Sequence, residues 1–441
     1  MPRRGKKMTY EDRLAIARRK EKTDRQIAEE TGWSIWTIRK WRRINQKRGK
    51  IGLWPKMGRP QTGALSSYAP ALCTEIEKKR REHPGWGPIT LVEELTLDPA
   101  WFGVALPSRA LVAAFLKEKK LVRKYERHVA LVSPPREPTL EVHDEWEMDA
   151  QGAQEVKGLG KVSIVNITDV VSHLKVESYP HLVGHTRLGW QDYQLVLRCA
   201  FVQYGLPKCI TLDHDSAFYD NTSASPYPSR LHLWLLGLGI HVAFIEKKPP
   251  LQHAQIERTH QTLTAQAITG QTWKSQGNLW QGLNQRRDFL NTIYPSRSLL
   301  YQAPLEAFPQ AAYSGRVYRP EWEAELFYLP HIYTFLAQGL WFRETSLHGE
   351  FWLGLRRYNA GRLSARTTQE LSFDPDTLEF IANTVGTNRT QRFAAKGITK
   401  IDLMGELAPF SRMPSYQLAL PFTLDTWRQN HLAQLVRGTI L

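Results

Sequence analysis

The chain has 441 residues, 42% of them hydrophobic, and its 59 Lys and Arg against 43 Asp and Glu give a formal net charge of +16. This length suffices for about three or four domains of ordinary size, each with its own core. No apolar run approaches the roughly 20 residues that cross a bilayer, and the N-terminal residues lack the apolar centre of a secretion signal. The sequence therefore predicts a cytoplasmic protein without a membrane partner.

The positive charge is concentrated near the N-terminus. Residues 1–60 hold 19 Lys and Arg against 6 Asp and Glu, residues 61–140 hold 12 against 9, and residues 141–441 hold 28 of each sign. A basic N-terminal part on a neutral body is typical of a protein that engages a polyanion, because counterion release from phosphates dominates nucleic-acid affinity. We expect DNA binding that weakens steeply with salt, and hence association with the nucleoid.

The three cysteines, Cys73, Cys199 and Cys209, have no CxxC spacing and no histidines paired with them. This pattern argues against a structural zinc site, because such sites need four Cys or His ligands at characteristic spacings. Three free thiols are compatible with a reducing cytoplasm.

The first predicted domain is a helix-turn-helix. Its helices are expected from Thr9 to about Lys20, from Arg25 to Glu30 with Asp24 as cap, and from Ile35 to Gln46 with Ser34 as cap. Thr31-Gly32-Trp33 supplies the turn, and the third helix would read DNA. Its side chains available to DNA are Trp36, Thr37, Arg39, Lys40, Arg42 and Arg43. The alternative is a charged, solvated helix in a small bundle.

A Gly-, Pro- and Lys-containing stretch from Lys47 to Thr62 predicts a basic linker. Arg59, within Gly58-Arg59-Pro60, could enter a narrow minor groove, although a plain linker is the favoured interpretation of so short a motif. A second helical unit follows, with helices expected over 69–82, 89–95 and 109–120, the last capped by Ser108. Its candidate DNA contacts are Arg109, Lys117, Lys119 and Lys120.

Three acidic residues then stand in contexts that suit catalysis. Asp149 ends an alternating strand pattern that includes Trp146 and Met148, and Asp213 ends the apolar run from Cys209 to Leu212. Glu257 falls in a helix predicted over Gln252 to Ile268. Its polar stripe, comprising Glu257, Arg258, His260, Gln261 and Thr264, would face solvent or DNA.

Hard carboxylate ligands on two strands and a helix suit Mg²⁺, with Mn²⁺ as a substitute. Two ions per site would activate the attacking oxygen and stabilise the leaving oxygen of a displacement at phosphorus. We hypothesise that Asp149 bridges the ions, that Asp213 holds one and that Glu257 holds the other. Asp169 is a competing acid for which a turn or strand-end role is favoured.

Local motifs around the second and third acids resemble those of a known family. Residues 213–218 (DHDSAF) are similar to the D-N-G-x-x-F signature, and residues 253–258 (HAQIER) to the N-G-x-x-E-R signature, of DDE transposases and retroviral-type integrases. Gly205-Leu206-Pro207 upstream of the second acid also fits. The resemblance, to insertion-sequence transposases with an integrase-type core, covers nearly the whole chain. The turn HPGWGP (83–88) looks like the second helix-turn-helix that precedes this core.

The chain departs from the family pattern at three points. Asp215 and Ala254 stand where the family prefers glycine, and the 44-residue spacing from Asp213 to Glu257 exceeds that of retroviral integrases, with residues 221–230 as the expected insertion. No metal ligand is lost. Asp215 could add charge near the metals or bind one in place of Asp213.

The resemblance implies an RNase H-like α/β core, a central mixed sheet flanked by helices, in a multidomain chain. The expected core order is three strands, helix, strand, helix, strand, helix, followed by a helix over Lys274 to Tyr294. Residues 301–308 (YQAPLEAF) resemble the motif that closes the family core. Strand-like segments over 349–398, split by the turn at 374–377, look like the small β-barrel of Mu-type transposases, and a terminal helix is expected over Leu424 to Val436.

The predicted domains are a helix-turn-helix (1–46), a basic linker (47–66), a second helix-turn-helix-like unit (67–135), the catalytic core (136–310), the barrel (311–410) and a helical tail (411–441). The predicted function is a DNA transposase that binds terminal inverted repeats, nicks to expose a 3′-OH and joins it to target DNA. The family also implies a homo-oligomer assembled on DNA. A catalytically inactive DNA-binding protein and a nuclease that cuts without joining are the alternatives.

Overall fold

A computed structural model of the protein describes residues 8–54, 63–122, 141–183, 188–245 and 254–405. The chain forms two compact units, one of Met1–Thr74 with Pro107–Val122 and one of Glu75–Leu106 with Arg123–Leu441. The finer division into domains stays a prediction. Among the described residues, the helices are all too short or too polar to cross a membrane.

Three short helices make up the start of the smaller unit. They are α1 (Tyr10–Arg18), α2 (Asp24–Thr31) and α3 (Ile35–Arg48), followed by the 3-10 turn η1 (Lys50–Leu53). One buried isoleucine from each helix, Ile16, Ile27 and Ile38, forms the core. Gly32 adopts φ 72° in the turn between α2 and α3, a left-handed conformation that favours glycine. These three helices were predicted, although Thr23 rather than Asp24 caps α2.

The chain continues with α4 (Pro70–Glu82), α5 (Pro88–Leu97) and the 3-10 turn η2 (Pro99–Trp101), and then α6 (Arg109–Glu118). The turn before α5 packs closely on the larger unit's own helices. The indole Nε1 of Trp86 donates to the Gln266 carbonyl oxygen at 3.0 Å, and a Cβ on Gly85 would lie 1.6 Å from the carbonyl oxygen of Ala265. Glycine is therefore required at position 85 for this approach.

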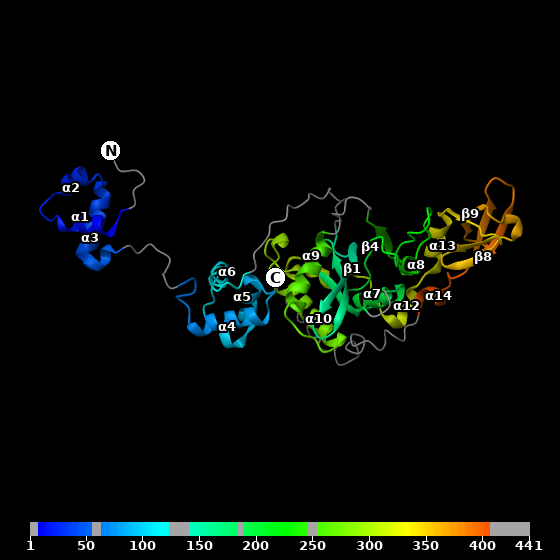
Figure 1. Ribbon diagram of the computed structural model, residues 1–441, viewed down its shortest axis with the longest axis horizontal. Coiled ribbons are helices and arrows are strands. Elements are labelled where there is room, and N and C mark those ends of the chain that lie inside the picture. The colour runs from blue at the N-terminus through cyan, green and yellow to red at the C-terminus, as the bar shows by residue number, and fades with distance from the viewer. Residues whose placement is uncertain (1–7, 55–62, 123–140, 184–187, 246–253, 406–441) are drawn as a thin grey trace. The chain divides into compact units, whose positions relative to one another are not determined.

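A five-stranded mixed sheet lies at the centre of the larger unit (Figure 1). Its strands are β1 (Glu145–Val156), β2 (Gly160–Asp169), β3 (Lys175–Leu182), β4 (Cys209–Leu212) and β5 (His241–Phe244), in the order β3-β2-β1-β4-β5. Strands β1, β2 and β3 pair antiparallel, whereas β4 runs parallel to both β1 and β5. This topology makes β1 the central strand.

Helices cover both faces of the sheet. They are α7 (Trp190–Tyr204), α8 (Arg230–Gly237), α9 (Ala254–Leu263) with a π-helical turn over Thr264–Ile268, and α10 (Gln276–Thr292). Trp146 and Met148 of β1 and Ile210 and Leu212 of β4 are buried with α7 in one large core. The order of strands and helices from β1 to α9 agrees with the sequence prediction.

Short helical segments follow the sheet: η5 (Arg297–Leu299), α11 (Pro304–Ala307), η6 (Pro309–Ala312), η7 (Pro320–Trp322), α12 (Glu323–Leu326) and α13 (Leu329–Ala337). The last part contains β6 (Trp341–Glu344), β7 (Glu350–Leu353), β8 (Arg356–Asn359), η8 (Arg362–Ser364), β9 (Thr368–Asp374), β10 (Glu379–Thr384), β11 (Thr390–Ala394) and α14 (Lys400–Met404). The helix predicted over Leu424 to Val436 lies outside the described residues.

The C-terminal strands differ from the predicted closed barrel. The described strands form an open antiparallel sheet, β11-β10-β9-β6, and a separate hairpin, β7-β8. The hairpin turns tightly at Gly354 and Leu355, both at positive φ. Tyr358 of β8 meets Phe380 of β10 edge to face, with ring centroids 6.0 Å apart. Burial of aromatic faces therefore holds the two pieces together without a continuous ladder.

Candidate active site

Two of the predicted acids follow the last residue pair of the β1–β4 ladder. Glu147 pairs with Thr211 as the last pair of this parallel ladder, and Asp149 and Asp213 each lie two residues further along the chain. Residues paired in this way point to the same face, opposite to Trp146 and Ile210 in the large core. Asp149 and Asp213 are both half-buried.

A buried tyrosine shows that the acids gather around one point. The pKa of Tyr193, near the start of α7, is raised first by burial and then by the charges of Asp215, Asp213 and Asp149. Each of these carboxylates is thus close enough to oppose ionisation of the same phenol. Tyr193 stays protonated at the edge of a region of concentrated negative charge.

Helix α9 contacts the face of the sheet that carries Asp149. The Nε2 atom of His260 lies 2.9 Å from Oδ2 of Asp149, and its Nδ1 atom lies 2.6 Å from the side-chain nitrogen of Asn166. Asn166 is the β2 residue opposite Asp149, and its amide nitrogen can only donate. His260 in its neutral form therefore carries its proton on Nε2 and donates it to Asp149.

Glu257 is exposed on α9, one helical turn before His260. Residues three apart share a helix face, so Glu257 is on the side of α9 that reaches Asp149. In the portion of the chain that the structure describes, no group of three or more His, Cys, Asp or Glu side chains is arranged to hold a metal ion. A metal site shared by Asp149, Asp213 and Glu257 therefore stays a prediction.

The loop after Asp213 is organised by two carboxylates. Oδ1 of Asp213 accepts a hydrogen bond from the backbone nitrogen of Asp215 at 3.0 Å, and Oδ1 of Asp215 accepts one from the backbone nitrogen of Ala217 at 2.8 Å. Asp215 thus shapes the turn at a position where glycine was the family preference, and it contributes charge beside Asp213.

Asp169 has the strand-end role that the sequence analysis favoured. It is fully buried. Its Oδ1 accepts from the backbone nitrogen of His143 at 2.7 Å, while its Oδ2 accepts from the backbone nitrogen and hydroxyl of Ser172 at 2.7 and 2.6 Å. Its oxygens therefore fix the turn after β2.

The predicted DNA-reading residues of α3 divide into two groups. Trp36 is 79% exposed, and Arg39, Lys40 and Arg43 are also exposed. Arg42 instead lies against α2, where its Nη1 donates to Asp24 at 2.6 Å and its Nη2 to the Arg19 carbonyl oxygen at 2.8 Å. Arg42 therefore holds the three helices together, which differs from the predicted free position. The Thr37 backbone nitrogen and hydroxyl are both engaged by Ser34.

The other predicted DNA contacts are placed as follows. Arg109 is exposed at the start of α6, and Arg258 and Gln261 are exposed on α9. Arg59 lies outside the described residues. The polar stripe of α9 is not wholly solvent-facing, because His260 is only 7% exposed and the Thr264 hydroxyl lies 3.2 Å from the side-chain nitrogen of Gln151.

Two supporting residues of this site, Tyr193 and Asn166, were not predicted. Tyr193 lies between polar residues at the start of a helix, and Asn166 lies in an apolar stretch of a strand. A signal existed for Asn166, since its polar amide interrupts a buried strand and must find a partner.

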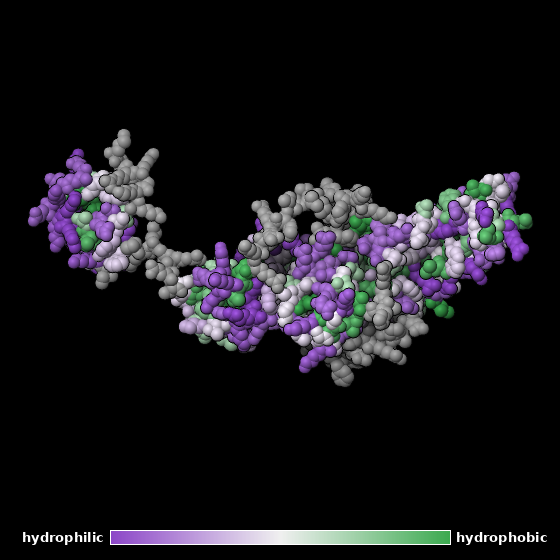
Figure 2. All heavy atoms as spheres, viewed as in Figure 1, coloured by the Kyte–Doolittle hydropathy of each residue, from purple (hydrophilic) through white to green (hydrophobic). Residues whose placement is uncertain are grey.

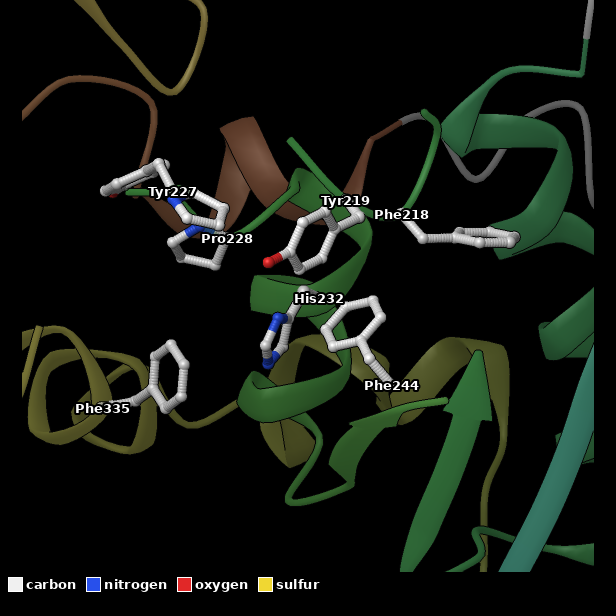
Figure 3. A pocket seen from close by; sticks show the side chains of 8 residues that line it. Phe218, Tyr219, Tyr227, Pro228, His232, Phe244 and Phe335 are labelled. Carbon is white, nitrogen blue, oxygen red and sulfur yellow. The ribbon is translucent and has the colours of Figure 1, made fainter. Parts of the chain in front are cut away.

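A small aromatic pocket lies next to the loop that follows Asp213. It has a volume of about 200 Å³. Figure 3 shows His232 between Phe244 and Phe335, with Tyr219 nearby and the Phe218 ring directed away. We call this the aromatic pocket. Burial lowers the pKa of His232 to about 4, so its imidazole is neutral near pH 7.

A larger groove of about 1050 Å³ adjoins the aromatic pocket and shares Tyr219 with it. This groove runs between the central sheet's loops and the C-terminal strands, and we call it the adjoining groove. Exposed apolar side chains line it, including Phe342 at 43%, Trp352 at 60% and Leu355 at 80% exposure. Hydrophobic colouring is visible over the C-terminal strands in Figure 2. Surfaces of this kind are typical of binding sites.

The larger unit is thus a mixed α/β body. Asp149 lies within the central strand β1, which continues to Val156 instead of ending at Asp149 as predicted, and Asp213 directly follows β4. No family model matches the chain. A similar solved structure is a chain from the cryoEM structure of the simian T-cell lymphotropic virus intasome in complex with PP2A regulatory subunit B56 gamma. It is 11% identical with a TM-score of 0.33, covering 70% of this chain and 97% of that chain. This TM-score is too low to carry an argument about function.

Proposed function

We propose that the protein is a Mg²⁺-dependent DNA transposase with an RNase H-like core, which nicks DNA at the ends of a mobile element and joins the exposed 3′-OH to a target. The observation that supports this proposal is the register of β1 and β4, in which Asp149 and Asp213 each lie two residues beyond the last pair, Glu147 and Thr211. A purely structural sheet has no need of two carboxylates there, since like charges repel.

The donor set fits a hard divalent cation. Asp149, Asp213 and Glu257 would hold Mg²⁺ through carboxylate oxygens, which this ion prefers. When bound, the metal would polarise the scissile phosphate and lower the barrier to attack at phosphorus. The surrounding carboxylates that act on Tyr193 supply the negative charge which such an ion would neutralise.

The chain's own residues position these ligands. His260 donates to one oxygen of Asp149 and is itself held by Asn166, so these contacts fix the orientation of the carboxylate. The exposed side chains of α3 would engage the element end, with Arg43 and Lys40 neutralising phosphates.

A strand-transfer assay tests the proposal directly. Purified full-length protein is incubated with Mg²⁺, a plasmid target and labelled duplexes from the DNA that flanks the gene, including any inverted repeats. We expect nicking at the repeat terminus and joined products. Binding without nicking would instead identify a DNA-binding protein, and nicking without joining a nuclease.

Removal of the His260 imidazole should slow catalysis without weakening DNA binding. We expect His260→Ala to lower the nicking rate by roughly 10- to 100-fold, as is typical when a group that orients a ligand is lost. His260→Gln should recover much of the rate, because its amide can still donate to Asp149. Rates are measured at saturating DNA, so that a change in affinity is separated from a change in turnover. Equal rates for all three proteins would exclude this role.

Arg43 on α3 should contribute one phosphate contact to duplex binding. We expect Arg43→Ala to weaken affinity across sequences and to reduce the slope of log affinity against log salt by about 1. Fluorescence anisotropy with a labelled duplex at several salt concentrations measures both. Lys157→Ala, at an exposed turn between β1 and β2, is the matched control and should leave the slope unchanged. An unchanged slope in Arg43→Ala would place the DNA elsewhere.

A further inference from the structure

The aromatic pocket begins close to the second acid. His214, the residue after Asp213, has its ring centroid 4.6 Å from that of Tyr219, and Tyr219 lies 5.1 Å from Phe244. His232 continues the series, at 5.6 Å from Phe244 and 5.0 Å from Phe335. A continuous run of rings therefore connects the loop of Asp213 with the pocket. Figure 3 shows the part of this run from Tyr219 to Phe335.

The size and chemistry of the pocket limit what it can bind. A volume of about 200 Å³ is below the roughly 300–1000 Å³ of sites for drug-sized ligands, so it fits one planar ring system. Its walls are aromatic faces and edges, which favour stacking. His232 is only 8% exposed and offers a neutral imidazole that can donate and accept hydrogen bonds. A planar heterocycle with polar edges matches these properties.

The adjoining groove suits the backbone that such a heterocycle would carry. Arg230 lies over the Trp190 ring with its guanidinium carbon 5.4 Å from the centroid, and Lys396 is exposed at the other side of the groove. Trp352, 60% exposed, presents a further ring surface in the groove. Proteins commonly bind unpaired nucleic acid through cationic side chains interspersed with aromatic rings.

We propose that the aromatic pocket accommodates one unpaired nucleobase of the DNA being processed, and that the adjoining groove carries the phosphates beside it. The inference rests on the proposed function, because it places the extruded base next to Asp213 at the reacting strand. Extrusion costs least where the duplex already ends, so a base at or beyond the element terminus is the expected occupant.

The test uses full-length protein and a duplex with a short single-stranded thymidine tail. This duplex is compared with a series of otherwise identical duplexes in which an abasic residue replaces one tail thymidine, at each position in turn. We expect one position at which the base strengthens binding about tenfold. A 5-iodouracil at that position should crosslink to Tyr219 or Phe335 on irradiation, as identified by mass spectrometry. Equal affinity for all tails, or crosslinks confined to other residues, would overturn the proposal.

Variants then test which side chains are responsible for the preference for a base over an abasic residue. Phe335→Ala should remove the preference for a base over an abasic residue, while its affinity for a blunt duplex stays that of the wild type. Tyr328→Ala is the matched control, since Tyr328 is 55% exposed just before the same helix and outside the pocket. If Phe335→Ala changes sedimentation and not base preference, the pocket is an interface between copies of the chain and the proposal fails.

Different results would contradict the proposed transposase activity and the proposed nucleobase pocket. Base-dependent binding without any nicking or joining would remove the proposed transposase activity and leave the pocket as a nucleobase site. Strand transfer with base-independent binding would retain the activity and exclude the pocket from it.

Discussion

Asp149→Asn is expected to abolish nicking and strand transfer, with a loss of at least on the order of 10³-fold, while DNA binding is unchanged. Asparagine keeps the shape of aspartate but lacks the charge that a divalent cation requires. It also alters the contact with His260, whose Nε2 lies 2.9 Å from Asp149. Asp213→Asn should have a comparable effect, since Asp213 is the second carboxylate of the proposed metal site.

The measurements are the single-turnover nicking rate in Mg²⁺ and the affinity for an end duplex. Asp376→Asn is the matched control, because Asp376 lies in an exposed turn between β9 and β10 and the substitution removes the same charge. Thermal unfolding is compared among the variants to exclude loss of fold. If Asp149→Asn nicks DNA at the wild-type rate, the carboxylates have no catalytic role and the proposed function is wrong.

The strands of the central sheet could be predicted because the sequence pattern that marks each strand is local. Alternating apolar residues around Trp146 and Met148 mark β1, and the apolar run before Asp213 marks β4. Strand order and register are long-range properties, so the sequence alone does not place Asp149 level with Asp213. Only the resemblance to a known family supplied that expectation.

Side chains that act through partners distant in sequence were not predictable. His260 occupies a polar position of an amphipathic helix, which predicts exposure, yet it is buried because Asp149 and Asn166 lie across from it. Arg42 likewise is a residue type that commonly contacts DNA, but it donates a hydrogen bond to Asp24, 18 residues away in sequence. In both cases a specific polar partner overrides the average preference of a surface position.

The largest expected effect on stability is at Glu323, which is also a polar side chain held in a buried position by specific partners. This side chain is fully buried at the start of α12, and Arg198 of α7 donates to it from Nε at 2.7 Å and from Nη2 at 2.6 Å. Trp234 of α8 donates from Nε1 at 2.9 Å, and the Tyr318 hydroxyl donates as well. Burial and the Glu323 charge raise the pKa of Tyr318, so the phenol stays a donor. The Glu323 carboxylate thus connects α7 and α8 to α12, in the segment that follows the central sheet.

Glu323→Gln is therefore expected to destabilise the larger unit by about 3–5 kcal/mol, because it leaves the Arg198 charge buried without a counterion. Urea unfolding monitored by tryptophan fluorescence measures the change. Glu325→Gln, two residues away and exposed, should be nearly neutral. Arg198→Met combined with Glu323→Gln should be more stable than Glu323→Gln alone, since the double variant no longer contains an unpaired buried charge. A double variant that is no more stable than the single one would show that packing, rather than the ion pair, sets the stability of this junction.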